Sequence, residues 1–326
     1  MAAPLRALTT LFFSDLPKGC AWRAQTELIH PAERSLPWRL WTLLRRAPGY
    51  DIVILNGASR EDQLAAMLLR RLRPSVPILI ADCQWKLDES LAARILNRLG
   101  VRMLEGPRTF YQVASSDDKA SFPVTWGVDP DRVFTAIYFP AVDDEELRAP
   151  VSEGGYVFAG GDSLRDYGTL IASAREVPFE VRIATNLPPP DGGLPENVTY
   201  GPLPRDAYLA GMCNASVVVV ALAEGTARSA GQTTYQAARI LGKLVLANDE
   251  AGVRDYLNDR ETGLVVPSGD AEALAETLRW ALDPANAAEV REITAKGRRE
   301  VLERGTKVHH TDRLLEIAAQ ATARDD

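Results

Sequence analysis

Short apolar segments alternate with amphipathic helical patterns along nearly the whole chain, and this alternation constrains the fold more than any other sequence feature. Segments such as 50–56 (YDIVILN) and 216–222 (SVVVVAL) are apolar at successive positions, as expected of strands that are covered on both faces. Strands that alternate with helices are typical of an open parallel sheet. The sequence therefore predicts an α/β fold whose parallel sheets carry helices on both faces.

The expected elements form two groups, separated by an acidic, proline-containing stretch at 139–154. The first group has strands at 50–56, 77–81, 110–115 and 132–138, and helices at 59–73 and 90–99. The second has strands at 156–159, 181–184, 198–200, 216–222, 243–247 and 263–266. Its helices are expected at 166–175, 205–212, 233–241, 252–258 and 271–282, with two more around 287–303 and 309–323. This pattern predicts two Rossmann-like domains, residues 1–145 and 146–326, with ligands at the carboxyl ends of the strands in the crevice between the domains.

Composition narrows the class of protein further. The 326 residues are 46% hydrophobic and 25% charged, and the absence of a run of about 18 apolar residues argues against a membrane-spanning helix. Three cysteines without CxxC spacing indicate a reducing compartment, so we expect a cytoplasmic protein. The net charge of −7 argues against nucleic acid as the main partner.

Charge is distributed unevenly along the chain. Residues 1–86 hold 12 basic and 7 acidic residues (+5), against 25 and 37 in the remainder (−12). The basic part would suit an anionic surface or a phosphorylated acceptor, although an ordinary solvated face is an equal alternative. The segment 36–46 (LPWRLWTLLRR) combines two tryptophans with three arginines: Trp38, Trp41, Arg39, Arg45 and Arg46. It is either an interfacial helix at an anionic membrane or a helix that covers the first sheet.

A Gly-Gly turn follows the first strand of the second group, in the run VFAGGDSLRDY (157–167). Gly160 and Gly161 would let backbone N–H groups approach an anion closely, and the next helix would add the positive end of its dipole. Arg165 would supply the full positive charge that a diphosphate leaving group needs. The alternative is a plain strand–helix turn with an exposed arginine.

A second loop of small and polar residues, AEGTARSAGQTTYQ (223–236), follows the apolar strand at 216–222. Small side chains leave room for a ligand, and Thr233 and Thr234 place N–H groups and hydroxyls at the start of a helix. The length and polarity of this loop favour a ligand site over an ordinary capped loop.

Together with the segment 241–267, these stretches resemble the donor-binding domain of GT-B glycosyltransferases, most nearly the retaining enzymes of family 4. The resemblance is close over residues 155–285, through RDYGTL, SAGQTTYQAARILGKLVLAND and GVRDYLNDRETGLVVPSGDAEALAETL. The run KGRREVLERGTKVHHTDRLLEI is similar to the closing helices of that family, which generally return to the N-terminal domain. The run VASSDDKASFPVTWGVDPDRVFTAIYFP is similar to the end of the N-terminal domain. The resemblance implies a GT-B fold, with two Rossmann-like domains facing each other across a cleft.

The chain departs from the family pattern at several positions. Family members usually carry two glutamates eight positions apart after the fourth strand of this domain, and the alignment places Arg228 and Gln236 there. Gln236 would still bind the ribose of the nucleotide, whereas Arg228 cannot accept hydrogen bonds from sugar hydroxyls, a role that Glu224 would take. In the N-terminal domain the usual Gly-rich first loop is missing, and the run from Asp82 to Trp85 (DCQW) stands where a histidine often ends a strand.

The resemblance implies transfer of a hexose-like sugar from a nucleotide-diphosphate sugar to an acceptor, with retention of configuration. The departing phosphate would act as the base, so no protein nucleophile is needed, and the donor is a co-substrate beside which we expect no cofactor. Donor contacts are expected from the residues of the two loops: Gly160, Gly161, Arg165, Arg228, Ser229, Gly231, Gln232, Thr233 and Gln236. Catalytic roles fall to Arg165, Glu224 and Asp82. Acceptor contacts fall to Asp82, Trp85 and the basic N-terminal surface, which suits an anionic or membrane-bound acceptor.

We expect no metal, because no acidic pair ends a strand as metal–diphosphate binding would require, and the adjacent His309 and His310 diverge on a helix. His30 is either an active-site contributor or a surface histidine.

Two functions other than sugar transfer are also compatible with the sequence. An epimerase acting on nucleotide sugars would need carboxylates and histidines, which are scarce here. A non-catalytic GT-B subunit that binds a nucleotide sugar or regulates a partner transferase is favoured by Arg228 and Gln236.

Overall fold

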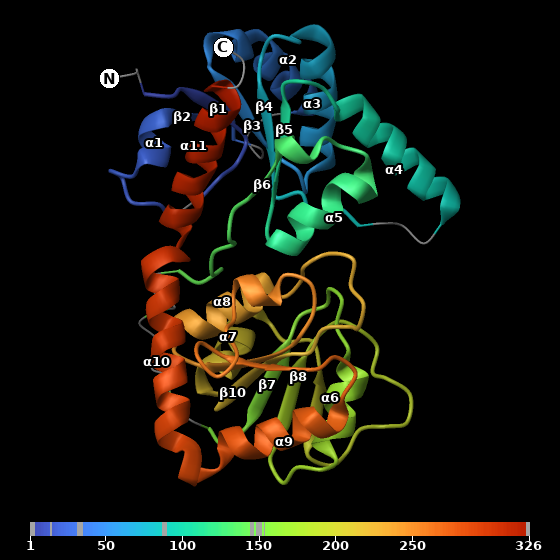
Figure 1. The fold of residues 1–326 in the computed structure, drawn as a ribbon, viewed down its shortest axis with the longest axis vertical. Coiled ribbons are helices and arrows are strands. Elements are labelled where there is room, and N and C mark those ends of the chain that lie inside the picture. The colour runs from blue at the N-terminus through green and yellow to red at the C-terminus, as the bar shows by residue number, and fades with distance from the viewer. Residues whose placement is uncertain are drawn as a thin grey trace. The chain divides into compact units, whose positions relative to one another are not determined.

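The computed structural model describes residues 4–13, 15–30, 35–86, 90–143, 147, 152 and 154–323, so the expected linker at 139–154 lies partly outside the described residues. The chain forms two compact units, Met1–Ala136 with Lys307–Asp326, and Ile137–Thr306. Each unit contains a six-stranded parallel sheet with helices on both faces (Figure 1). This confirms the predicted α/β class with two Rossmann-like units.

The sheet of the first unit has the strand order β2-β1-β3-β4-β5-β6. Its strands are β1 (Ala7–Thr9), β2 (Thr26–Leu28), β3 (Ile52–Asn56), β4 (Ile78–Ala81), β5 (Thr109–Val113) and β6 (Val133–Thr135). Strand β2 lies on one side of β1, and β3 lies on the other side. This reversal of direction creates a topological switch point between β1 and β3. Polar groups that follow these two strands therefore lie next to each other.

Two layers of helices cover this first sheet. Helices α2 (Leu36–Arg46), α3 (Arg60–Leu72), α4 (Leu91–Leu104) and α5 (Ser116–Trp126) pack on one face, and α1 (Ala21–Gln25) and α11 (Lys307–Ala323) on the other. Helix α3 begins as predicted, since the Ser59 hydroxyl accepts a hydrogen bond from the backbone N–H of Asp62. Helix α4 extends five residues beyond the predicted helix end at Leu99.

The sheet of the second unit has the order β12-β11-β10-β7-β8-β9. Its strands are β7 (Val157–Gly160), β8 (Val181–Ala184), β9 (Val198–Gly201), β10 (Val217–Val220), β11 (Leu244–Asn248) and β12 (Leu264–Val266). Helices α7 (Arg205–Asn214) and α8 (Gln232–Ile240) cover one face, and α6 (Tyr167–Ala174) and α9 (Ala271–Leu282) the other. The long helix α10 (Ala287–Arg304) contributes Val301 to the first of these cores and Ile293 to the second.

The central strand β10 consists of four valines, all fully buried, and this explains why it could be recognised from sequence alone. The order of the strands again places a switch point between neighbours, here between β7 and β10. The loops that follow these two strands are the two candidate ligand loops, and the sheet brings them together.

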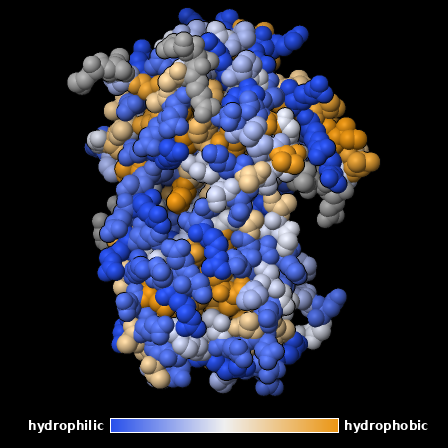
Figure 2. Space-filling view, in the orientation of Figure 1, coloured by the Kyte–Doolittle hydropathy of each residue, from blue (hydrophilic) through white to orange (hydrophobic). Residues whose placement is uncertain are grey.

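None of the helices in the described ranges combines the length and apolar character needed to cross a bilayer. Apolar side chains nevertheless remain on the surface, and the largest group in the view of Figure 2 covers helix α4.

Candidate functional site

Glycine is required at the last position of β7 and at the first position of the loop that follows it. A Cβ on Gly160 would lie 2.4 Å from the ring of Tyr208, and one on Gly161 would lie 2.7 Å from a guanidinium nitrogen of Arg165. Gly161 also has a φ of +109°, which L side chains rarely adopt. The hydroxyl of Tyr167 donates to the carbonyl oxygen of Gly161 at 2.6 Å and holds the turn. The Gly-Gly turn is therefore a tightly packed backbone feature.

The side chain of Arg165 folds back over this turn. Its Nε donates to the carbonyl oxygen of Gly160 at 3.2 Å, and its Nη1 donates to that of Ser163 at 2.7 Å. Its Nη2 lies 3.4 Å from the hydroxyl oxygen of Thr234, in the first turn of α8. The predicted cation is thus fixed between the turn and the start of a helix.

The loops after β7 and β10 are also joined through their backbones. The N–H of Asp166 donates to the carbonyl oxygen of Ala221 at 3.0 Å, and the N–H of Ala223 donates to that of Leu164 at 3.0 Å. Leu164 adopts a positive φ of +53° within this bridge. Such strained backbone persists only where the surrounding contacts hold it in place.

Arg228 lies beside Arg165. Its Nη2 donates to the hydroxyl oxygen of Ser163 at 2.8 Å, and its Nη1 donates to the carbonyl oxygen of Ser229 at 3.2 Å. Both arginines are half-buried, and both bind Ser163. Arg228 was expected among the donor contacts, at the position of a family glutamate, and the structure places it as a second cation next to the Gly-Gly turn.

Helix α8 begins at the same place. Its N-cap is Gly231, with φ +84°, and no side chain in the described part of the chain caps it. The Gln232 side chain turns back to the Ser229 hydroxyl, whereas Thr233 is exposed. The first N–H groups of a helix and its dipole attract anions. Two guanidinium groups and this helix start together form a site suited to a diphosphate.

Gln236, the predicted ribose ligand, lies further along α8 and is buried. Its Nε2 donates to the carbonyl oxygen of Tyr138 at 3.0 Å, and its Oε1 accepts a hydrogen bond from Arg239 at 3.0 Å. Arg239 is also buried and pairs with Glu300. Burial lowers the pKa of Arg239 to about 10. The structure thus gives both ends of the Gln236 side chain partners inside the unit.

Acidic residues near the two arginines are fixed by hydrogen bonds of their own. Asp162 accepts hydrogen bonds from Thr185 and from the backbone N–H and side chain of Asn186, and these bonds lower the pKa of its carboxyl group. Glu250 accepts hydrogen bonds from the N–H groups of Gly225 and Thr226 and so fixes the loop after β10. Glu224 is exposed near the start of that loop.

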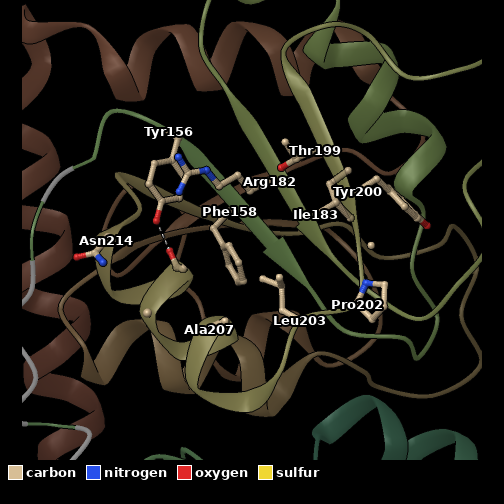
Figure 3. A pocket seen from close by; sticks show the side chains of 13 residues that line it. Tyr156, Phe158, Arg182, Ile183, Thr199, Tyr200, Pro202, Leu203, Ala207 and Asn214 are labelled. Carbon is tan, nitrogen blue, oxygen red and sulfur yellow. Dashed lines mark hydrogen bonds between the residues drawn. The ribbon is translucent and has the colours of Figure 1, made fainter.

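A cavity of about 470 Å³ lies on the face of the second sheet that α7 covers (Figure 3). Strands β7 to β9 and helix α7 line it, and the guanidinium of Arg182 stacks on the ring of Tyr156, 3.7 Å from its centroid. No residue of the two candidate loops lines this cavity. It is therefore distinct from the predicted donor site.

In the first unit, Asp82 directly follows β4 with a positive φ of +58°, and its backbone N–H donates to the side-chain oxygen of Gln112 at 2.8 Å. Trp85 donates its indole N–H to the carbonyl oxygen of Gly57 at 2.7 Å. The Trp85 ring packs on Tyr111, Phe122 and Trp126. The two residues expected to contact the acceptor thus both lie at the end of β4, with Trp85 held in an aromatic cluster.

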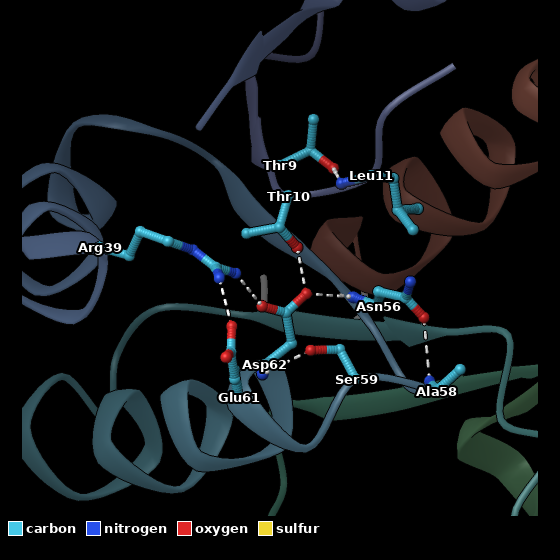
Figure 4. Close-up of polar contacts among 9 residues, drawn as sticks. All are labelled: Thr9, Thr10, Leu11, Arg39, Asn56, Ala58, Ser59, Glu61 and Asp62. Atoms are coloured by element: carbon cyan, nitrogen blue, oxygen red, sulfur yellow. Dashed lines mark hydrogen bonds and ion pairs between the residues drawn. The ribbon is translucent and has the colours of Figure 1, made fainter. Parts of the chain in front are cut away.

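A buried polar network that sequence reasoning missed lies at the switch point between β1 and β3 (Figure 4). Asp62 accepts hydrogen bonds from the hydroxyl of Thr10 at 2.5 Å, the N–H of Asn56 at 3.0 Å and Arg39 at 2.9 Å. Burial raises the pKa of Asp62 against the opposing effect of these hydrogen bonds. In the sequence, Asp62 lies in the first turn of the helix predicted at 59–73, a position that the helix dipole alone would explain.

This network corrects one expectation for segment 36–46. Arg39 is buried and ion-paired with Asp62 and Glu61, so it cannot contact a membrane. Arg46 pairs with Glu27, and Arg45 stacks over the ring of Trp41 on the exposed side of α2. The amphipathic pattern of α2 thus serves mainly to cover the sheet, as the second of the two alternatives predicted.

The histidines do not converge on a site. His30 packs against Phe12. His309 and His310 lie in the first turn of α11, and His310 is buried near Phe13. Within the described ranges, no group of three or more His, Cys, Asp or Glu side chains is arranged to hold a metal ion.

No protein-family model matches the chain, and no curated protein matches it by sequence. Solved structures do match. Anabaena HepE, crystallised with UDP-glucose, has a TM-score of 0.66 at 13% identity, covering 97% of this chain and 100% of HepE. A glycosyltransferase from Rickettsia africae has a TM-score of 0.62 at 14% identity, covering 91% and 84%. Sucrose-phosphate synthase from Thermosynechococcus elongatus has a TM-score of 0.61 at 19% identity, covering 91% and 81%. The chain therefore has the two-domain α/β fold of the GT-B glycosyltransferases.

Proposed function

We propose that the protein is a glycosyltransferase that binds a nucleotide-diphosphate sugar through its second unit and transfers the sugar to an acceptor. The observation that carries this proposal is the convergence of Arg165 and Arg228 on Ser163, beside the uncapped start of α8. A leaving diphosphate develops negative charge, and guanidinium groups and helix N–H groups at fixed positions stabilise such charge.

The solved relatives support a uridine nucleotide as the first candidate. The HepE crystals held UDP-glucose in one case and UDP in another. We therefore propose UDP-sugars as the donors to test first, with the diphosphate at the two arginines and the N–H groups at Gln232 and Thr233.

Retention of configuration and independence from metal are finer parts of the same proposal. Retention rests on the sequence resemblance to family 4, in which the departing phosphate serves as the base. Metal independence rests on the two arginines, which supply positive charge where the leaving group would lie. Glu224, exposed on the loop after β10, is the proposed contact for the sugar hydroxyls.

The acceptor is proposed to bind the first unit near Asp82, at the end of β4, and to be anionic or membrane-bound. The observation behind this part is the positive φ of Asp82, since strained backbone is concentrated at functional sites. We draw the anionic character from the +5 charge of residues 1–86.

A second candidate function is a non-catalytic subunit that binds nucleotide sugar. It is favoured by Gln236, whose amide is bonded to Tyr138 and Arg239 and offers no carboxylate to a ribose. Incubation of the purified protein with UDP-sugars separates the two functions, because transferases slowly hydrolyse their donors. Release of UDP supports the enzyme, whereas binding without release supports the non-catalytic subunit.

A further inference from the structure

Helix α4 carries a row of apolar side chains that no part of the described chain covers. The row comprises Leu91, Ile95, Leu96, Leu99 and Met103, each between 53% and 71% exposed. On a helix with 3.6 residues per turn these positions share one side. In the view of Figure 2, apolar surface gathers over α4 with hydrophilic atoms beside it. Isolated apolar residues on a surface need no explanation, but a contiguous group of this kind marks an interaction site.

The opposite side of α4 already provides the packing that the fold requires. Val101 and Leu104 are 5% and 2% exposed and belong to the core beneath the helix. The helix also packs on α3. The exposed row is therefore not a displaced part of the core, and its function lies outside the unit.

The charged residues of α4 indicate which kind of partner its apolar row would bind. Arg94, Arg98 and Arg102 are spaced four residues apart, are exposed, and form one flank of the apolar row. Helix α4 contains no acidic residue, and none of these three guanidiniums has an ion pair within the described part of the chain. An apolar face bordered by arginines is the pattern of a helix that lies in the surface of an anionic bilayer.

A second copy of the chain fits this surface less well. A two-fold interface brings the same face of each partner together, so the arginine row of one α4 would approach that of the other without an acidic residue on either helix. Anionic headgroups neutralise the arginines, whereas acyl chains accept the leucines.

We propose that α4 is a membrane-binding helix, with its apolar row inserted between the lipids of an anionic leaflet and its three arginines at the headgroups. This surface differs from α2, where Arg39 is buried, and the inference does not depend on the proposed donor site.

The test is co-sedimentation of the full chain with vesicles of phosphatidylglycerol and with vesicles of phosphatidylcholine. At low salt the phosphatidylglycerol vesicles should retain the wild type and the phosphatidylcholine vesicles should retain little. Changing Arg94, Arg98 and Arg102 to Gln should weaken retention on the order of a hundredfold, since each basic residue near an anionic leaflet contributes independently. Leu96→Ser combined with Leu99→Ser should abolish retention.

Matched control variants are available on α10, a helix of the other unit. Changing Arg291, Arg298 and Arg299 to Gln, or Leu302 to Ser, alters exposed residues of the same types and should leave retention unchanged. All of these variants should melt close to the wild type, because the altered side chains are exposed.

A reporter placed on the helix distinguishes insertion from mere attachment. The cysteines Cys20, Cys83 and Cys213 are buried, so Leu96→Cys provides a selective position for an environment-sensitive dye. Its emission should shift to the blue on phosphatidylglycerol vesicles, and the same dye at Leu302→Cys should not respond. The proposal would be overturned if the phosphatidylglycerol vesicles did not retain the wild type, or if the dye responded equally at both positions. It would also be overturned if the wild type formed a dimer that Leu96→Ser combined with Leu99→Ser dissociates. UDP binding, measured on the same samples, reports on the donor site separately.

Discussion

Arg165 and Arg228 bind the same residue, Ser163, one through its carbonyl oxygen at 2.7 Å and the other through its hydroxyl at 2.8 Å. The two cations come from loops that are 63 residues apart in the chain and are joined because β7 and β10 are neighbours in the sheet. Like charges held this close repel each other, and a bound diphosphate would remove that repulsion. The arrangement therefore favours an anionic ligand.

Arg165→Ala should weaken UDP binding about tenfold or more, since a charge-assisted hydrogen bond contributes roughly 1.5–3 kcal/mol. Thermal shift provides the measurement. A ligand at 100 times its dissociation constant adds about 2.7 kcal/mol to stability, and a tenfold loss of affinity reduces this to about 1.4 kcal/mol. Arg175→Ala is the control, because Arg175 is an exposed arginine in the same unit, bonded to the carbonyl oxygens of Gly192 and Gly193. Equal stabilisation of wild type and Arg165→Ala by UDP would remove Arg165 from the site.

Arg228→Glu restores the residue type that the family usually carries at this position. If Arg228 contributes positive charge to the diphosphate, this substitution should weaken UDP more than Arg228→Ala does, because it adds a repulsive charge next to the phosphates. Binding of uridine, which has no phosphate, should change little in either variant. Tighter UDP binding by Arg228→Glu than by the wild type would contradict the assignment and support the usual family geometry.

Gln236→Ala should destabilise the second unit by about 1–3 kcal/mol, since it removes one hydrogen-bond partner each from the carbonyl oxygen of the half-buried Tyr138 and from the buried Arg239. Urea unfolding measures this loss. UDP affinity of the folded variant then tests the proposed ribose contact. A reduced affinity for uridine would support the contact, and an unchanged affinity would leave Gln236 a purely internal residue.

Arg39→Met should destabilise the first unit by about 3–5 kcal/mol, because Asp62 would remain as a buried charge without its cation. The side chains of this pair are only 5% and 3% exposed. Arg45→Met is the matched control, since Arg45 lies on the exposed side of the same helix and should cost less than about 0.5 kcal/mol. Similar losses for both variants would mean that the Asp62 network does not stabilise the fold.

The stability of the Arg39→Met variant should also depend on pH more strongly than that of the wild type. Because burial raises the pKa of Asp62 above the ordinary value of 3.8, the folded state holds its proton over a pH range in which the unfolded state has lost it. The free energy of unfolding therefore falls as pH rises from 3.8 through the folded-state pKa. Loss of Arg39 raises that pKa further and widens the range. Unfolding measured across this range should show a steeper decline for Arg39→Met than for the wild type, and Arg39→Met combined with Asp62→Asn should abolish the difference.

Most of the fold could be predicted because its strands are apolar on both faces. β8 was predicted residue for residue, and the all-valine β10 to within two residues at its ends. Strands β1 and β2 were missed, although β6 and β12, which also have three residues each, were predicted. The sequence of β2 (TEL) lacks the apolar run that marks the buried strands. Helix α5 was missed because its apolar residues share no side and Pro123 lies inside it. The segment 252–258 was predicted as a helix, but only Val253–Asp255 forms a short 3-10 turn.

The two candidate loops could be located from the sequence, but the contacts of their side chains could not. The Gly-Gly turn and the loop after β10 were identified from residue types that belong at the ends of parallel strands. The position of Arg228 beside Arg165 depends on the adjacency of β7 and β10, which no local pattern reveals. The pairing of Arg39 with Asp62 likewise depends on how α2 packs on α3, and in sequence Arg39 resembles any exposed arginine of an amphipathic helix.

Calorimetric titration of uridine, UMP and UDP into the wild type and into the Arg165→Ala, Arg228→Ala double variant tests the central claim most directly. In the wild type, affinity should rise steeply from uridine to UDP, because each phosphate gains contacts with the two guanidiniums and the start of α8. The double variant should bind uridine as the wild type does and should lose at least about a hundredfold in its preference for UDP, roughly the sum of two charge-assisted bonds. A preference for UDP that survives in the double variant would contradict the proposal that these two arginines hold the donor diphosphate.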